Sequence, residues 1–476
     1  MNQVAEKGPR VDEFVENPRK ALWSLALPMM VGMMVQTIYS VVDMIFVGRV
    51  GGDALTALAF NVPLVFFGLG MVFGLGSGVT AVVAQYIGSG DKRNADNSAE
   101  HGIVIGVILG VVFTGAGLTW GKSLLAALGA PPHIVPLAWS YFRVIAVGYI
   151  FMVSSIFFRS ILSGEGDMKT PLIIQGGGTI LNIILDPIFI FGLEMGVEGA
   201  AVATVLSQAS VSLVFAYFML VKKRAYITFA LKDFAFSRVV LGKILKVGIP
   251  ASFSMLIMSM GGGVFNKILV SFSSDAVAGY QVGMRIDHVY LMPLISIATS
   301  LVTLVGMFYG AKRLDLVRAI TQYAISRGIL IGLVAGSLFF AFAEPLVSVF
   351  TQDPEIYQTG VQYLKYFVFA YPFIAVGMIG GRMLQGLGFG IPMLVLTFLR
   401  VVLISVVLAY TFVFVAGKPV QWVWISQVIA VICSAGIALL WLRSSLRRLE
   451  RGDVRKVKGV PHGVVSSDPL RQAQEV

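Results

Sequence analysis

Long apolar runs constrain this chain more than any other feature. Twelve windows are each apolar over about 20 residues, the length that crosses ~30 Å of hydrocarbon. Only α-helices and closed β-barrels satisfy their backbone hydrogen bonds in lipid, and runs this long are helical. The sequence therefore predicts an all-α polytopic membrane protein. The expected spans are 21–47, 56–87, 101–126, 133–159, 171–193, 195–221, 246–272, 280–309, 319–346, 355–381, 392–416 and 420–443.

Composition excludes the alternatives to a membrane protein. Hydrophobic residues make up 57% of the 476-residue chain and charged residues 13%, about half the usual charged share of ~25%. Soluble domains have too much surface to hide that much apolar area, and disordered chains need the opposite composition. A single cysteine, Cys433, excludes an intramolecular disulfide, and the four histidines lack metal-site spacing.

Basic residues predict the orientation of the chain. Lys and Arg number 27 in one set of alternating loops and termini, and three (Arg49, Lys122 and Lys418) in the other set. Loops rich in Lys and Arg stay in the cytoplasm. We therefore expect a multi-pass protein of the cell membrane with both termini cytoplasmic. The net charge of +11 is then a topology signal, so we expect no nucleic-acid partner. The charged first 20 residues argue against a cleavable signal peptide.

The two halves of the sequence resemble each other. Asp53-Ala54 recurs as Asp275-Ala276 and Gly88 recurs as Gly310, both at the same offset along the chain. Each half holds six spans, so both halves begin on the same side, and the repeat axis runs along the membrane normal. Two such bundles facing each other are a transporter architecture. The predicted parts are a cytoplasmic segment 1–20, an N-lobe 21–221, a cytoplasmic linker 222–245, a C-lobe 246–443 and a basic, partly disordered tail 444–476.

Polar residues form stripes on helices of the N-lobe. In the first span, Gln36, then Tyr39 or Ser40, then Asp43 follow helical spacing. The fifth span carries one unbroken polar face, and the sixth adds Thr204 and Gln208 on one face. The face of the fifth span comprises Gln175, Thr179, Asn182 and Asp186.

Carboxylates inside spans are costly and usually mark function. The oxygen-bearing side chains near Asp43 and Asp186 suit a hard monovalent cation or a shared proton. Pro187 lacks an amide donor and displaces the carbonyl of Ile183, which loosens the helix beside Asp186. The alternative is that each aspartate caps a helix or pairs with a buried base. The first, fifth and sixth spans contain no Lys or Arg, which favours a functional site.

The C-lobe contains different charged residues: Lys267 in the seventh span, and Arg285, Asp287 and His288 in the eighth. Similar depths on adjacent helices allow a Lys267–Asp287 ion pair. A second coupling site and basic side chains reaching the interface are the alternatives.

Two further patterns bear on packing and on the cavity. Gly70, Gly74 and Gly78 have the small-xxx-small spacing of closely packed membrane helices. Methionines after Pro28 on the first span, which include Met33, are expected to line an adaptable cavity.

Taken together, the two six-span halves and these motifs resemble the multidrug and toxic compound extrusion (MATE) family. The motifs are Leu27-Pro28, Gln36, Tyr39 and Asp43 on the first span, Asn182 and Asp186-Pro187 on the fifth, and the Gly-x-Gly repeats after the fourth and tenth spans. The resemblance covers residues 15–445 and is greatest to the archaeal-type members of the DinF-like branch. Acidic residues that the NorM-like branch carries in its C-lobe are replaced here by Met258 and Ile374.

The resemblance implies a V-shaped, outward-open transporter with its cation-coupling site in the N-lobe. It implies that the first span bends near Pro28 when the site is protonated, which reshapes the N-lobe cavity. We expect Gln36, Met33, Gln175 and Thr179 to line this cavity. The implied coupling residues are Asp43, Asn182, Asp186 and Thr204, with Tyr39 and Tyr141 nearby, and the first four would also hold Na⁺.

The resulting expectation is a secondary antiporter that exports amphipathic, cationic drugs or toxic compounds in exchange for H⁺ or Na⁺. We expect a monomer surrounded by lipid, with no cofactor beyond the coupling ion. A related flippase of lipids or lipid-linked intermediates is the alternative. An enzyme is not expected, because the chain contains no GxSxG or HExxH motif.

Overall fold

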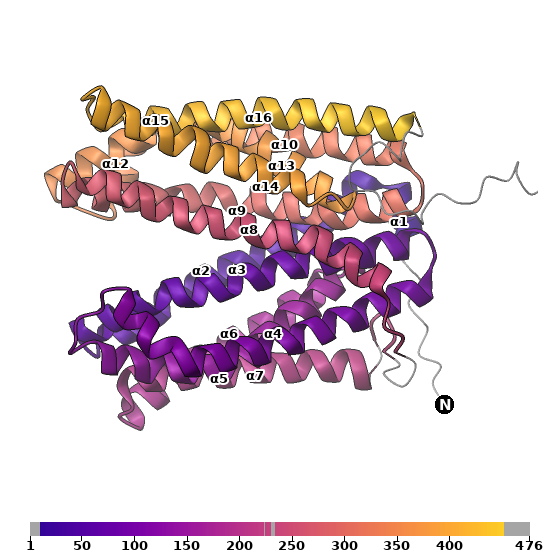
Figure 1. Ribbon diagram of the computed structural model, residues 1–476, viewed down its shortest axis with the longest axis horizontal. Helices are drawn as coiled ribbons and strands as arrows, with labels where there is room; N and C mark the ends of the chain where they lie inside the picture. Colours follow the sequence, from indigo (N-terminus) through magenta and orange to yellow (C-terminus); the bar gives the residue numbers. More distant parts are fainter. Residues whose placement is uncertain (1–9, 223, 230–233, 452–476) are drawn as a thin grey trace, which may run out of the picture.

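A computed structural model describes residues 10–222, 224–229 and 234–451 of the protein (Figure 1). The parts of the predicted N-terminal segment and tail at 1–9 and 452–476 lie outside the described residues. In the described part of the chain, twelve segments are long and apolar enough to cross a membrane, which confirms the predicted number. The first six are α2 (Pro18–Gly48), α3 (Gly52–Gly88), α4 (Lys92–Ala127), α5 (Val135–Gly164), α6 with η1 (Lys169–Pro187, Ile188–Gly192) and α7 with η2 (Gly196–Ala216, Tyr217–Val221).

The last six spans form the second bundle. They are α8 (Arg238–Val270), α9 (Ser274–Gly310), α10 (Leu314–Ala341), α12–η4–α13 (Pro354–Phe367, Val368–Ala370, Tyr371–Gly386), α14–η5–α15–η6 (Ile391–Phe398, Leu399–Val406, Val407–Tyr410, Thr411–Val415) and α16 (Gln421–Glu450). The short helices α1 (Val11–Glu16) and α11 (Ala343–Ser348) lie outside these spans. We call the first bundle the N-lobe and the second the C-lobe.

The internal repeat appears in the helix boundaries. Helices α3 and α9 have the same length of 37 residues, and α9 starts and ends at the offset from α3 that the short motifs show. Helix α10 starts at Leu314, which is separated from the start of α4 at Lys92 by the same offset. The repeat predicted from short motifs therefore extends to whole helices.

Several helix ends lie five or more residues from the predicted span ends, and two of them have a clear local cause. Helix α8 begins at Arg238 rather than 246, where the Ser237 side chain accepts a hydrogen bond from the Val240 amide and caps the helix. The last part of the predicted linker is therefore helical. Helix α10 ends at Ala341 rather than 346. Pro345 cannot donate to the Ala341 carbonyl and its ring would clash with it, so the helix stops and α11 follows.

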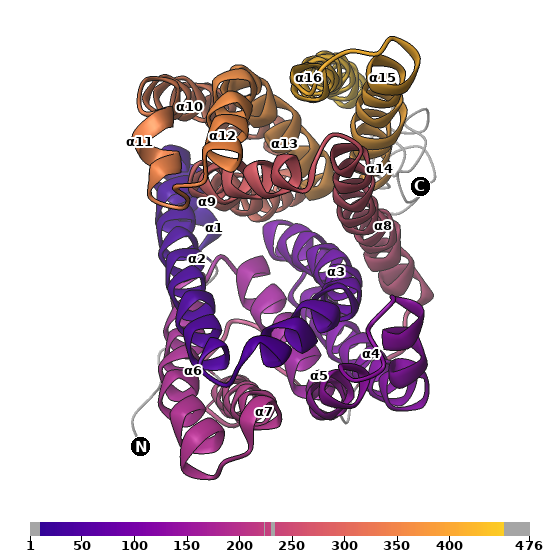
Figure 2. The ribbon, with the colours of Figure 1, turned by 90° about the vertical axis from the view of Figure 1, so that its left-hand side faces the viewer.

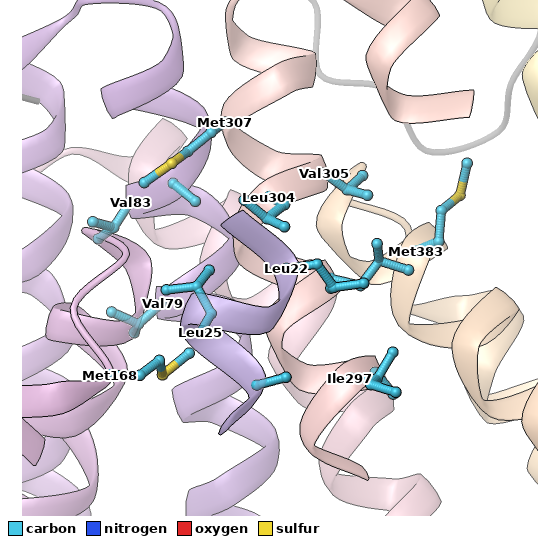
Figure 3. Packing of buried hydrophobic residues seen from close by; sticks show 14 of the residues in the cluster. Leu22, Leu25, Val79, Val83, Met168, Ile297, Leu304, Val305, Met307 and Met383 are labelled. Atoms are coloured by element: carbon cyan, nitrogen blue, oxygen red, sulfur yellow. The ribbon is translucent and has the colours of Figure 1, made fainter. Parts of the chain in front are cut away.

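The two lobes meet at one end of the molecule. We call this the linker end, because the described residues between η2 and α8 lie there. Figure 1 shows the bundles converging at this end and separating towards the opposite end. A buried cluster joins the lobes: Leu22 and Leu25 of α2 pack with Leu304 of α9 and Met383 of α13 (Figure 3).

The first helix of each lobe packs against the other lobe. Helix α2 contacts α9 of the C-lobe as well as α6, and α8 contacts α3 of the N-lobe as well as α14. Viewed from the end opposite the linker, α2 and α8 lie on the two sides of the junction between the lobes (Figure 2). A relative movement of the lobes must therefore move both of these helices.

Glycines permit the close approach of α3 and α8, as their spacing predicts. A Cβ atom on Gly74 would lie 2.2 Å from the Ser252 backbone nitrogen, and one on Gly78 would lie 2.4 Å from the Ile244 carbonyl oxygen. The Ser252 hydroxyl also donates to the Met71 carbonyl at 2.7 Å. The lobes are therefore in backbone contact here.

Gly74→Ala should destabilise the protein by about 1–3 kcal/mol, because the added methyl group overpacks the α3–α8 contact. Gly70→Ala on the same face is the matched control, since a Cβ there would lie an ordinary 3.4 Å from Met255 Cβ. Thermal unfolding of both purified variants measures the difference. Equal melting temperatures would contradict the prediction.

Candidate functional site

The predicted polar residues of the N-lobe come from four helices that pack around one region. Helix α6 contacts both α2 and α7, and α5 packs against α7. Asp186 and Asn182 of α6 are buried, with exposed fractions of 0% and 3%. Asp43 and Tyr39 of α2 are half-buried. The stripes predicted on separate helices therefore face each other.

Asn182 and Asp186 form the innermost part of the site. The Asn182 Nδ2 atom donates to Asp186 Oδ1 at 3.3 Å, one helical turn away. Asn182 Oδ1 and Asp186 Oδ2 are both buried, and neither has a hydrogen-bond partner within the described chain. Buried polar atoms without partners are rare in folded proteins. Two such acceptor oxygens on one turn can be satisfied by a bound cation or proton.

The second carboxylate lies close to the first. Asp43 and Asp186 are near enough to interact electrostatically. The Tyr39 ring lies beside both carboxylates, with its hydroxyl next to Thr204 of α7, and Tyr141 of α5 also lies within range of both charges. The structure thus brings together all six residues that the family resemblance implies.

The backbone is irregular beside Asp186. Helix α6 ends at Pro187, and the chain continues as the π-helical turn η1, Ile188–Gly192. Pro187 cannot donate an amide hydrogen and displaces the carbonyl of Ile183. This agrees with the loosening predicted from the sequence, and π-helical turns often occur at functional positions.

The ligand set consists of oxygen atoms. Within the described residues, no group of three or more His, Cys, Asp or Glu side chains could hold a metal ion. The two orphaned oxygens, the Asp43 carboxylate and the Thr204 hydroxyl suit a hard cation such as Na⁺, with water completing its shell. The same carboxylates could instead share a proton, because two like charges in a low dielectric titrate as a coupled pair.

The other predicted cavity residues are more exposed than Asn182 and Asp186. Gln36 is exposed, and Gln175 and Thr179 are half-buried. Ser40 is exposed and its hydroxyl donates back to the Gln36 carbonyl at 3.0 Å, so Tyr39 is the residue of the stripe that faces the site.

Met33 lies on α2 where this helix meets the C-lobe. Helix α2 runs from Pro18 to Gly48 with Pro28 inside it. The Met33 sulfur lies 3.7 Å from the Ser296 hydroxyl of α9. Met33 is therefore at the contact between the lobes, where movement of α2 would be transmitted to the C-lobe.

The ion pair considered for the C-lobe is wrong. Lys267, Arg285 and His288 are exposed, whereas Asp287 is buried. The Asp287 carboxylate accepts hydrogen bonds from the Tyr363 hydroxyl at 2.6 Å and the Tyr371 hydroxyl at 2.5 Å. Sequence patterns indicate neither tyrosine, because both lie in a different span and no spacing along the chain links them to Asp287.

Among the basic residues expected in loops, Arg159 and Arg382 lie near the ends of span helices. Arg159 belongs to α5 and Arg382 to α13, so both add to the basic residues within the membrane helices. Arg159 lies 5.2 Å from the centre of the Phe73 ring, and Arg382 donates to Gln385 Oε1 at 3.0 Å. Within the described chain, neither of them nor Arg400 of η5 has a carboxylate within 4.0 Å.

Comparison with known proteins yields relatives along most of the chain. A family model described as MatE matches residues 28–188 and 250–411, two segments at corresponding positions of the two lobes. A probable multidrug resistance protein NorM from Thermotoga maritima is 27% identical over 445 residues, which cover 91% of this chain and 94% of that protein. A FAD transporter from Shewanella oneidensis is 27% identical over 76% of this chain and 79% of its own length.

A solved structure is also similar. It belongs to a MOP superfamily transporter from Pyrococcus furiosus, with a TM-score of 0.89 and 34% sequence identity. The match covers 93% of this chain and 99% of that chain.

Proposed function

This chain belongs to the MatE family of transporters, and from that premise we propose that it is a secondary antiporter. It exports amphipathic or cationic drugs or toxic compounds in exchange for H⁺ or Na⁺, and its coupling site is in the N-lobe. The observation that carries this proposal is the pair of buried, unpartnered oxygens on Asn182 and Asp186, next to the second carboxylate of Asp43.

Binding of a cation at the site couples cation entry to substrate export. A proton bound between Asp43 and Asp186 removes the repulsion between their charges. A sodium ion does the same while filling the coordination of Asn182 Oδ1 and Asp186 Oδ2. Either ion pulls α2 towards α6, and α2 contacts the C-lobe through α9. Ion binding therefore reshapes the cavity between the lobes, and the substrate leaves outward as the ion enters.

The orientation follows from the charge distribution. With the linker and both termini in the cytoplasm of the cell, the lobes meet on the cytoplasmic side and separate towards the outside (Figure 1). This is an outward-open form. In exchange for a neutral substrate, one charge that moves inward across 100 mV supplies about 2.3 kcal/mol, which sustains a roughly fifty-fold substrate gradient.

Reconstitution into liposomes tests this function. Dye efflux is measured under an imposed proton gradient, an imposed sodium gradient and no gradient, with protein-free liposomes as the control. Efflux driven by one of the two gradients is expected. Equal dye movement under all three conditions would contradict antiport.

A second candidate cargo is an anionic lipid or lipid-linked intermediate. The observation in its favour is the set of half-buried span arginines without a carboxylate partner in the described chain, Arg159, Arg382 and Arg400. The Shewanella relative is named as a transporter of FAD, which is an anion. The description of the Pyrococcus structure states that its binding pocket has reverse polarity. Translocation of a fluorescent anionic lipid in the same liposomes, lost in Arg159→Gln, would favour this cargo. Cationic dye efflux unaffected by that substitution would favour a drug exporter.

A further inference from the structure

Asp287 of the C-lobe is a buried carboxylate that the proposed coupling mechanism does not use. Its exposed fraction is 2%, and each of its oxygens accepts one tyrosine hydroxyl, from Tyr363 and from Tyr371. No Lys, Arg or His of the described chain lies within 4.0 Å of it. Burying a charge without a cation is expensive, and a proton on the carboxylate would remove that charge.

The two tyrosines lie on opposite sides of a break in the tenth span. Helix α12 ends at Phe367, the 3₁₀ turn η4 covers Val368–Ala370, and α13 begins at Tyr371. Pro372 follows the break and cannot donate an amide hydrogen. The Asp287 carboxylate therefore connects α9 to both halves of an interrupted helix.

The α13 side of this connection makes two further contacts with α9. The Tyr290 hydroxyl of α9 donates to the Tyr371 carbonyl at 2.6 Å, and the two rings stack with centroids 4.0 Å apart. On the α12 side, the Tyr363 hydroxyl has a second neighbour, the Met284 sulfur at 3.6 Å. Met284 is exposed.

In the described structure, the titratable side chains that face Asp287 are all tyrosines. Tyr280 and Tyr290 face it from α9, Tyr363 from α12 and Tyr371 from α13. Helix α16 contributes Trp424, whose ring stacks on Tyr280, together with Gln427 beside Tyr280. Helix α10 contributes Phe339 against Tyr371, and α8 contributes apolar residues. The nearby basic residues of α8 and α9 are exposed, and Lys365 of α12 pairs with Glu344 at 2.9 Å.

We propose that Asp287 is a proton-binding site in the C-lobe and that its occupancy sets the bend of the tenth span. In the ionised form, both tyrosine hydroxyls donate to the carboxylate and hold α12 and α13 together. On protonation, the new hydrogen on Oδ2 is donated to the Tyr363 oxygen, and the Tyr363 hydrogen turns to the Met284 sulfur. The charge-assisted bond to α12 becomes a neutral one, which is about half as strong, while Tyr371 keeps Oδ1.

This site goes beyond the N-lobe coupling proposed above and is independent of it. Two measurements on the full-length reconstituted protein test it. An infrared difference spectrum between acidic and alkaline pH detects protonated carboxyl groups. Spin labels at Gln358→Cys on α12 and Ala319→Cys on α10, with Cys433→Ser removing the native thiol, report the position of α12.

The variants distinguish proton binding at Asp287, seen as a carboxyl band, from the movement of α12, seen as a change in label-to-label distance. Wild type should show a shift in the label-to-label distance between the two pH values. Asp287→Asn should lose one carboxyl band and the distance shift, whereas Tyr363→Phe should keep the band and lose the shift. Tyr366→Phe, an exposed tyrosine on the same helix, is the matched control and should behave as wild type.

Three outcomes would overturn the proposal. They are a difference spectrum unchanged by Asp287→Asn, a wild-type distance that is the same at both pH values, and a distance shift that survives Tyr363→Phe. If Asp287→Asn does not fold, the Tyr363→Phe measurement decides alone. The variant Asp43→Asn distinguishes this proposal from N-lobe coupling. It should lose efflux but retain the Asp287 carboxyl band and the label-to-label distance shift. Loss of those signals in Asp43→Asn would overturn the independence of the two sites.

Discussion

Asp43→Asn should abolish ion-driven efflux while leaving the protein folded in the membrane. An amide has nearly the same shape as a carboxylate, but it takes up no proton at neutral pH and carries no charge to attract Na⁺. Asp43 is only half-buried and makes no hydrogen bond on which α2 depends in the described structure, so folding should tolerate the change. The coupled gradient of a neutral substrate, about fifty-fold at 100 mV, should fall to the level of passive leak.

Dye efflux from liposomes under proton and sodium gradients measures this effect, with drug resistance of cells as the second readout. Asp53→Asn is the matched control, because Asp53 is an exposed aspartate in the first turn of α3. Asp186→Asn combined with Asp43→Asn should be no worse than Asp43→Asn alone, since residues acting as a unit are not additive. Ion-coupled efflux that persists in Asp43→Asn would contradict the proposed coupling site in the N-lobe.

The parts of the fold that could be predicted from the sequence are those set by local patterns. Apolar runs predict all twelve spans, and short motifs at one constant offset predict the repeat that α3 and α9 follow along their whole length. The stripe through Asn182 and Asp186 was also predictable, because residues four apart share a helix face.

The parts that could not be predicted depend on contacts between helices. Tyr363 and Tyr371 bind Asp287 from 76 and 84 residues away, across a helix break that no periodicity indicates. A charge normally ends a span, so Arg159 is expected in a loop. In the structure α5 continues to Gly164, and the Thr80 hydroxyl of α3 donates to the Ser160 carbonyl at 2.8 Å. Packing against α3 therefore keeps this charged turn helical.

The linker between the lobes is attached to the N-lobe through carboxylates. Glu165, directly after α5, accepts hydrogen bonds from the backbone amides of Ile227 at 2.8 Å and Tyr226 at 3.0 Å. Asp96 of α4 accepts from the amide of Thr228 at 3.0 Å and from Lys92 at 2.6 Å. A segment that must follow both lobes during transport is thus fixed to one of them, and Glu165 is the buried part of that attachment.

Stability of the linker attachment should fall as the pH rises through neutrality. Burial raises the pKa of the Glu165 carboxyl from 4.5 to about 7, assisted by the nearby Asp167, although the two amide donors and Lys92 act in the opposite direction. A carboxyl whose pKa is higher in the folded state stabilises the fold when protonated. Its contribution is complete below pH 4.5 and is lost as the pH rises through about 7. The loss amounts to about 3 kcal/mol.

Glu165→Gln should therefore gain stability relative to wild type as the pH rises. The amide is neutral at every pH, so the variant avoids the cost of a buried charge, although it loses one acceptor for the linker amides. It should be slightly less stable than wild type at pH ~4.5 and more stable at pH ~8, with a relative change of about 3 kcal/mol between them. Thermal unfolding across this range measures the crossing, with the exposed Glu355→Gln as control. If the stability of wild type and of Glu165→Gln changed with pH in the same way, the prediction would be wrong, because the Glu165 carboxyl would then not titrate in the folded protein.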